Sequence, residues 1–204
     1  MQRLPAPLQK IVSQFSALPG VGPKSALRMA LTLLKWQPES VRALGQNIAG
    51  LRDALHICSR CGSLADADPC HLCTDPTRTR ELLCLVAEWD SLMVMEEAGL
   101  YKGRYLILGG LLSPLDGVEA SALEMPRLTA ILREAEVQEV ILALGSTMEA
   151  EATSTYIHTF IGRDFPQVRV TRLAQGIPLG AELKYVDRET LKQSLKYRHS
   201  LEAN

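Results

Sequence analysis

The sequence predicts an α/β protein in which a small helical unit and a cysteine-rich segment precede a mostly parallel sheet flanked by helices. Three observations support this fold class. Apolar residues recur at helical spacing near the amino end, four cysteines stand close together, and short apolar runs beyond them alternate with stretches of helical length. Such alternation is typical of parallel sheets covered by helices.

The first quarter of the chain has the pattern of short helices. Apolar residues at 8, 11, 12, 15 and 18 follow the spacing of one helix face, which predicts a helix from Leu8 to Leu18. The residues PGVGP at 19–23 then interrupt it. Pro23 suits the first turn of a second helix, predicted over KSALRMALTLLKW. A third helix is predicted over 40–55.

The middle of the chain holds four cysteines with the spacing C-x2-C-x8-C-x2-C: Cys58, Cys61, Cys70 and Cys73. Each pair can form a tight turn with both sulfurs on one side, and four thiolates complete a closed, tetrahedral Zn²⁺ site. We therefore predict one structural zinc ion per chain. Two disulfides, which need an oxidising compartment, or buried thiols by chance are the alternatives. His56 and His71 each remain open as a replacement for one sulfur, and Cys84 is expected to be a buried core thiol.

The rest of the chain predicts the sheet and its helices. Strands are expected at 82–87, 104–110, 137–145 and 168–174, and helices at SLMVMEEAG, MPRLTAILREAE, EAEATSTYIHTFIG and RETLKQSLKYR. TDPTRTRE is expected to be a polar connector between the cysteines and the first strand. Ligands of parallel sheets gather at the carboxyl ends of the strands. Loops that hold Glu88, Asp90 and Asp116 should lie there.

Charge is unevenly distributed along the chain. Residues 1–57 hold seven Lys/Arg and two Asp/Glu, whereas residues 81–161 hold four Lys/Arg and thirteen Asp/Glu, although the net charge of the whole chain is only −1. A basic segment on a nearly neutral protein favours an anionic polymer as a partner. A solvated helical surface is the alternative that charge alone leaves open.

The glycine-rich turn between the first two helices suits a nucleic-acid backbone. Gly20 and Gly22 let bare main chain approach a phosphate, and the N–H groups at the start of the following helix point at it. Lys24 and Arg28, one turn apart, add positive charge on the same side. We predict sequence-independent binding of DNA through its backbone. The alternative is a corner between helices, with glycines that serve only the turn.

These motifs together resemble the RecR family of bacterial recombination mediators over nearly the whole chain. The resemblance rests, in chain order, on LPGVGPKSALRMA, the four-cysteine segment followed by TDPTR, SPLDG, ILALGSTMEAEATSTYI and LAQGIPLGAELKYVD. It implies four regions: a helix-hairpin-helix region at 1–57, a four-cysteine zinc finger at 58–80, a Toprim-like domain at 81–174, and a C-terminal extension at 175–204 with a Walker-like segment and a helix.

The resemblance also implies a function without catalysis. RecR proteins form ring-shaped tetramers that can encircle DNA, and they work with RecO and RecF to load the RecA recombinase on gapped DNA coated by single-strand-binding protein. We therefore expect a DNA-binding adaptor, a homotetramer, and RecO and RecF as partners. No apolar stretch has the length of a membrane span and no signal peptide is evident. A cytoplasmic, nucleoid-associated protein without a membrane partner is expected.

The acidic residues decide between an adaptor and an enzyme. RecR proteins usually carry Val-Val-Glu-x-x-x-Asp at the first Toprim strand, but here Ala87 and Ser91 occupy the acidic positions, and Glu88 and Asp90 are each displaced by one residue. A Mg²⁺-dependent Toprim nuclease or primase-like enzyme, the alternative function, would need a glutamate and an Asp-x-Asp pair. The SPLDG loop offers only Asp116. We predict that the three acids bind a protein partner; ordinary solvated carboxylates are the alternative.

Overall fold

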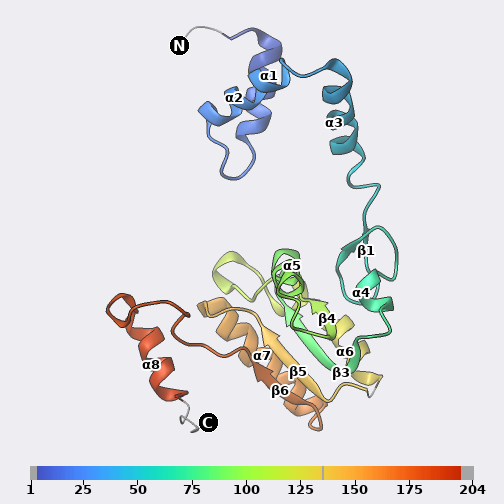
Figure 1. The fold of residues 1–204 in the computed structure, drawn as a ribbon. Helices are drawn as coiled ribbons and strands as arrows, with labels where there is room; N and C mark the ends of the chain where they lie inside the picture. Colours follow the sequence, from blue (N-terminus) through green and yellow to red (C-terminus); the bar gives the residue numbers. More distant parts are fainter. Residues whose placement is uncertain (1–3, 135, 199–204) are drawn as a thin grey trace. The chain divides into compact units, whose positions relative to one another are not determined.

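The computed structural model describes residues 4–134 and 136–198, and the chain divides after Ala54 into two compact units (Figure 1). We call residues 4–54 the helical unit and the described residues from Leu55 onward the α/β unit. The domain boundaries predicted from the sequence stay predictions.

The helical unit consists of three helices: α1 (Ala6–Ser16), α2 (Pro23–Leu33) and α3 (Pro38–Gly50). Proline opens α2 and α3, because its fixed φ suits the first helical turn and its missing N–H costs nothing there. The small side chains of Ala26 and Ala30, one turn apart on α2, are buried. The third helix begins two residues before its predicted start. It ends five residues before its predicted end, because residues 51–54 form a turn.

The α/β unit begins with the cysteine segment. Two short antiparallel strands, β1 (His56–Ile57) and β2 (Leu64–Ala65), pair with His56 opposite Ala65. They are followed by α4 (His71–Thr74), a single helical turn. Elements this short cannot hold themselves together by hydrophobic burial, which agrees with a segment ordered by a metal ion.

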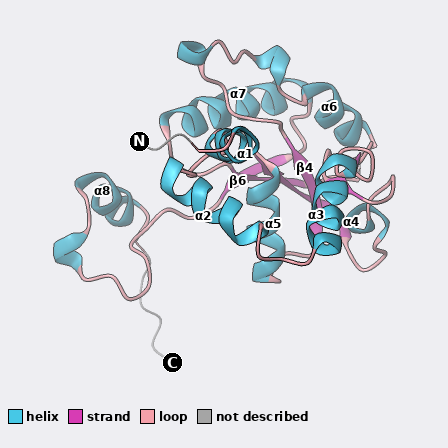
Figure 2. Cartoon of the chain, turned by 90° about the horizontal axis from the view of Figure 1, so that it is seen from above, coloured by secondary structure: helices cyan, strands magenta, loops and turns pink. Residues whose placement is uncertain are grey.

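A four-stranded parallel sheet forms the centre of this unit (Figure 2). Its strands lie in the order β4-β3-β5-β6: β4 (Gly103–Ile107), β3 (Thr79–Val86), β5 (Glu139–Ala143) and β6 (Arg169–Arg172). The parallel sheet and the α/β fold class are confirmed. The central strand β3 starts three residues earlier than predicted, because its polar first half pairs with β4 through Thr79 opposite Gly103.

The longer helices of this unit are α5 (Trp89–Ala98), α6 (Met125–Arg133), α7 (Met148–Asp164) and α8 (Arg188–Lys196). Alternate residues of β3 point to opposite faces of the sheet. Leu83 and Leu85 join a core cluster with residues of α6 and α7, whereas Cys84 and Val86 join a second cluster with α5 and the cysteine segment. The cysteine segment thus packs on the same face of the sheet as α5. Within the described residues, no helix is both long and apolar enough to cross a membrane.

Candidate metal centre and nucleic-acid interface

The first cysteine turn, residues 58–63, is closed by two backbone hydrogen bonds. The N–H of Cys58 donates to the carbonyl of Ser63 at 2.7 Å, and the N–H of Gly62 donates to the carbonyl of Cys58 at 3.0 Å. Gly62 has φ +76°, a conformation that glycine adopts without a steric penalty. This turn brings the side chains of Cys58 and Cys61 to the same side.

The second turn forms around α4. The N–H groups of Cys73 and Thr74 both donate to the carbonyl of Cys70, at 3.0 and 3.1 Å. The N–H of Cys70 in turn donates to the sulfur of Cys58 at 3.4 Å, which ties the two turns together.

The four sulfurs have the spacing that zinc requires. All four lie within 4.8 Å of one another, with 3.8 Å between the Sγ atoms of Cys58 and Cys73 and 3.5 Å between those of Cys61 and Cys70. A tetrahedron with Zn–S bonds of about 2.3 Å has sulfur–sulfur edges of about 3.8 Å. The five cysteines of the chain are free thiols, so the disulfide alternative is not supported. Neither histidine of this segment belongs to the cluster.

The chemistry of the donor set also suits a cation. Hydrogen bonds from neighbouring thiols, that of Cys73 first, lower the pKa of Cys61 to about 5, whereas burial raises the pKa of Cys70 to about 11. The pocket therefore favours a negative charge on one sulfur and disfavours a second negative charge. Four thiolates at this spacing repel one another unless a metal ion neutralises them. Cys84 is fully buried outside the cluster, where burial raises its pKa to about 12, as expected of a core thiol.

Three carbonyl groups of the first cysteine turn are bound by the body of the α/β unit. The carbonyl of Cys58 accepts from Nη1 of Arg127 at 2.6 Å, and that of Cys61 accepts from the N–H of Ile107 at 2.9 Å. The carbonyl of Gly62 accepts from Nε1 of Trp89 at 2.8 Å. The metal-binding turn is therefore fixed to α6, β4 and α5 at once.

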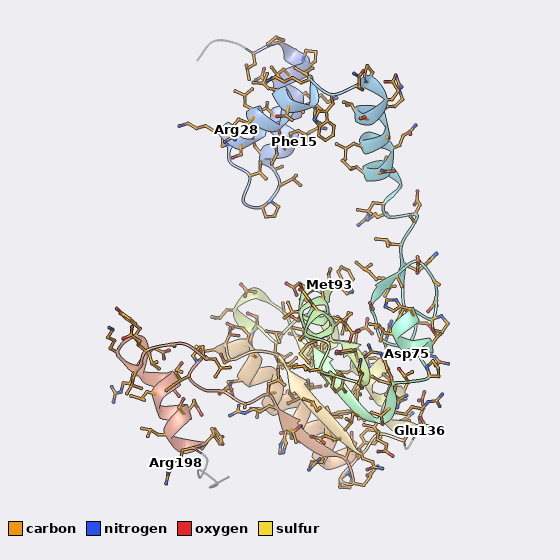
Figure 3. The ribbon with its side chains drawn as sticks, in the orientation of Figure 1. Phe15, Arg28, Asp75, Met93, Glu136 and Arg198 are labelled. Carbon is orange, nitrogen blue, oxygen red and sulfur yellow. The ribbon has the colours of Figure 1, made fainter. Side chains whose placement is uncertain are left out.

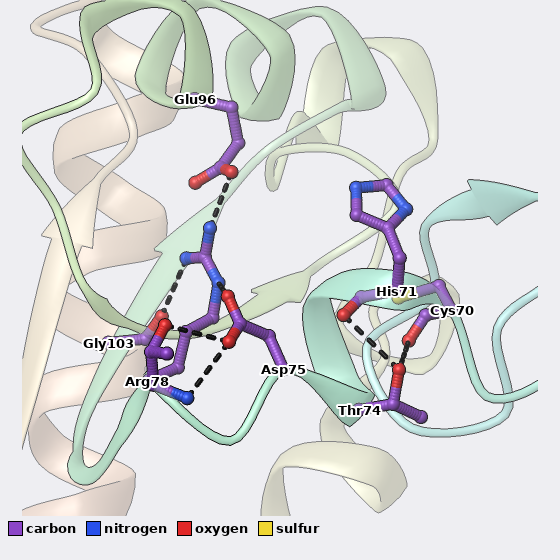
Figure 4. Close-up of polar contacts among 8 residues, drawn as sticks. Cys70, His71, Thr74, Asp75, Arg78, Glu96 and Gly103 are labelled. Carbon is purple, nitrogen blue, oxygen red and sulfur yellow. Dashed lines mark hydrogen bonds and ion pairs between the residues drawn. The ribbon is translucent and has the colours of Figure 1, made fainter.

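Arg78 is a further anchor that the sequence did not reveal (Figure 4). Its side chain is only 8% exposed, although it lies in the segment predicted to be a polar connector. Nη1 donates to the carbonyl of Gly103 at 3.0 Å, Nη2 donates to Glu96 at 2.5 Å, and the guanidinium lies 5.5 Å from the ring centre of Tyr105. Arg78 does lie in the connector before β3, but its burial could not be predicted, because its partners lie on α5 and β4, far away in the sequence.

The hairpin of the helical unit is open to solvent. Gly20 has φ +76°, Gly22 is the residue that precedes α2, and a Cβ added to either glycine would meet nothing within 4 Å. Lys24 and Arg28 are exposed on α2, and Arg28 projects from this helix in Figure 3. The first N–H groups of a helix have no partner within the helix, so main-chain donors lie at the start of α2 beside Lys24, and Arg28 follows one turn further along.

The three predicted acids lie beyond the carboxyl ends of neighbouring strands, Asp90 in the first turn of α5, and we call Glu88, Asp90 and Asp116 the acidic edge. Glu88 lies between β3 and α5, next to the first residue of α5. Its Oε1 lies 3.9 Å from the place of a Cβ on Gly110, so its side chain reaches toward the loop after β4. Asp116 accepts a hydrogen bond from Ser113 at 2.6 Å. All three acids are exposed, and in the described part of the chain only the cysteines form a group close enough for a metal ion.

Comparisons with known proteins agree with each part of this architecture. Family models match residues 8–51 (RecR, helix-hairpin-helix), 55–75 (RecR, four-cysteine zinc finger domain), 81–174 (Toprim domain) and 176–199 (RecR, C-terminal). The recombination protein RecR of Nitratidesulfovibrio vulgaris is 62% identical over 98% of this chain and 100% of its own length. Those of Maridesulfovibrio salexigens and Alcanivorax borkumensis are 53% and 42% identical, over 98% and 97% of this chain and 100% and 98% of their own lengths.

The chain belongs to the RecR family. It is a mediator of recombinational DNA repair and not an enzyme, so the nuclease or primase-like alternative falls away. The predicted helix-hairpin-helix helices, four-cysteine zinc finger, Toprim-like sheet and C-terminal extension are confirmed, and so is zinc as the cofactor of the finger. The roles of individual residues in binding DNA and partners stay predictions.

Proposed function

We propose that this RecR-family protein is a DNA-binding adaptor that holds the sugar–phosphate backbone at its hairpin and recruits protein partners at its acidic edge. The observation that carries the proposal is the exposed hairpin before α2. Its two glycines have open space around them, and the first amides of α2 have no partner within the helix. Lys24 and Arg28 on the same helix are exposed to solvent. Main-chain donors and cations recognise phosphates without reading bases, so we expect binding that is independent of sequence.

The test is a double variant, Lys24→Ala with Arg28→Ala. We expect weaker binding to every DNA sequence, and the slope of log affinity against log salt should fall by about 0.7–0.9 for each phosphate that the variant no longer neutralises. Fluorescence anisotropy of labelled DNA at several salt concentrations measures both effects.

The matched control removes two other cations of the helical unit. Lys35→Ala with Arg42→Ala lowers the charge by the same amount, and both residues are exposed away from the hairpin. If the control weakens binding as much as the double hairpin variant does, only net charge matters and the hairpin is not the binding surface.

We further propose that the acidic edge binds RecO or RecF, that the protein forms a ring-shaped tetramer, and that it acts in the cytoplasm on gapped DNA in support of RecA loading. Exposed carboxylates at the ends of two neighbouring strands favour a basic partner surface. Glu88→Lys with Asp116→Lys should abolish co-purification with RecO or RecF, whereas Glu119→Lys, an exposed acid nearby in the sequence, should not. Retention of both partners by the double variant would refute this role.

A further inference from the structure

Trp89 lies between two residues of the acidic edge and contacts the zinc finger. It is the first residue of α5, with Glu88 before it and Asp90 after it. Its indole Nε1 donates to the carbonyl of Gly62 at 2.8 Å. The indole N–H is the only polar group of tryptophan and can only donate, so this bond fixes the orientation of the ring.

The acceptor of this bond belongs to the metal-binding turn. Gly62 directly follows the ligand Cys61, is itself buried, and donates its own N–H to the carbonyl of Cys58. The direction of the Gly62 carbonyl therefore depends on the closed form of this turn. Zinc bonded to the sulfurs of Cys58 and Cys61 would hold this turn at two points, so loss of zinc should loosen the turn.

We propose that Trp89 is a positioning residue that couples zinc binding to the acidic edge. While zinc holds the first cysteine turn, the Gly62 carbonyl holds Trp89, and Trp89 fixes the first turn of α5 together with Glu88 and Asp90. The coupling is reciprocal, so the Trp89 bond also helps the finger to retain zinc. The benefit to a bound partner rests on the proposed function, whereas the coupling itself does not.

Two other contacts of the same turn provide the comparison. Arg127 binds the carbonyl of Cys58 from α6, and the N–H of Ile107 binds that of Cys61 from β4. Neither donor adjoins an acid of the acidic edge in the sequence. Loss of the Arg127 hydrogen bond should therefore weaken zinc retention without moving the start of α5, whereas loss of the Trp89 hydrogen bond should do both.

The experiment compares Trp89→Phe with Arg127→Met in the full-length, zinc-loaded protein. Phenylalanine keeps an aromatic ring and lacks the N–H. In Trp89→Phe we expect amide hydrogen exchange at residues 88–92 to become about threefold to tenfold faster, the range of one neutral hydrogen bond, with release of zinc to a chromophoric chelator accelerated similarly. Arg127→Met should accelerate zinc release but leave exchange at residues 88–92 as in the wild type.

A second measurement observes Trp89 itself. The chain has two tryptophans, so Trp36→Phe leaves Trp89 as the only one. Removal of zinc from this variant should shift the emission to longer wavelength as the released indole becomes more exposed to water. The same removal of zinc should accelerate amide exchange at residues 88–92. In Trp89→Phe, by contrast, removal of zinc should accelerate exchange at those residues only slightly further.

Equal exchange at residues 88–92 in zinc-loaded wild type and Trp89→Phe would overturn the proposal. So would an equal acceleration throughout β3 and β4, because that result means general loosening of the unit. Failure of RecO and RecF to bind at the acidic edge would refute the partner proposal and leave these exchange and zinc measurements unaffected.

Discussion

Arg78 shows how one side chain joins separate parts of the α/β unit. It lies between the zinc finger and β3, and it contacts α5 through Glu96 and β4 through the carbonyl of Gly103. A charge this deeply buried is tolerated only when it is paired and hydrogen-bonded. Asp75, 3.7 Å from Nε of Arg78, brings the end of the finger to the same cluster.

Replacement of Arg78 should therefore be costly. Arg78→Met leaves Glu96 without its partner; because Glu96 keeps 28% of its side chain exposed, we expect a loss of about 2 kcal/mol, less than the 3–5 kcal/mol typical of fully buried pairs. Urea unfolding of the zinc-loaded protein measures this loss. Arg80→Ala is the control: Arg80 is 68% exposed, so its replacement should change stability by less than about 0.5 kcal/mol. Equal stability of Arg78→Met and wild type would contradict this role.

At the scale of an element, α8 depends on its capping residue. The Oδ1 of Asp187 accepts from the N–H groups of Glu189 and Thr190 at 3.0 and 2.9 Å, and Oδ2 accepts from the hydroxyl of Thr190 at 2.7 Å. These bonds, that from the Thr190 hydroxyl first, hold the pKa of Asp187 below its ordinary value. The cap matters because α8 has no buried residue to stabilise it.

The stability of α8 should therefore depend on pH. Because the pKa of Asp187 is lower in the folded state, its contribution is fully present above the unfolded pKa of about 3.9 and is lost as the pH falls through the folded value. NMR chemical shifts of residues 188–196 should report fraying on acidification. Asp187→Ala should fray at every pH, whereas Asp187→Asn keeps an acceptor and should lose the pH dependence. Acid fraying of the same size in Asp187→Asn would assign the effect to another group.

At the scale of the whole molecule, both units carry apolar surface suited to contacts between chains. The helical unit has a groove of about 530 Å³ whose apolar lining is Phe15, Met29, Leu33, Trp36 and Leu44. The C-terminal extension exposes Leu179 completely and Leu183 by 62%. Two different contacts per chain are enough to close a ring, which favours the proposed tetramer.

Native mass spectrometry tests this assembly. We expect four chains in the wild type, and dimers when either surface is disrupted, by Trp36→Asp in the groove or by Leu179→Asp with Leu183→Asp in the extension. The combination should give monomers. Leu100→Asp, at a residue that is 90% exposed elsewhere, should leave the mass unchanged. A wild-type monomer at every concentration would contradict the ring.

The sequence allowed the prediction of features that depend on neighbours along the chain. The spacing of Cys58 to Cys73 predicted the metal ligands, because a two-residue gap places both sulfurs on one side of a turn whatever surrounds it. The glycines and prolines predicted the hairpin for the same reason. Helix ends were less accurate, as at α3, because the turn after Gly50 has no strong signal in the sequence.

Contacts between distant segments could not be predicted in this way. Arg78 stands in a polar run, and only the packing of α5 and β4 around it shows that it is buried. Likewise the indole of Trp89 and the carbonyl of Gly62 are 27 residues apart.

The amino-acid sequence by itself determined the fold class, the zinc ligands and the glycine hairpin, since each follows from residue types at short, fixed spacing. The tertiary structure alone decided that the zinc finger packs on the α5 face of the sheet and is held there by Trp89, Ile107 and Arg127. The physical reason is that these bonds form only after the sheet has brought separate segments within hydrogen-bond distance.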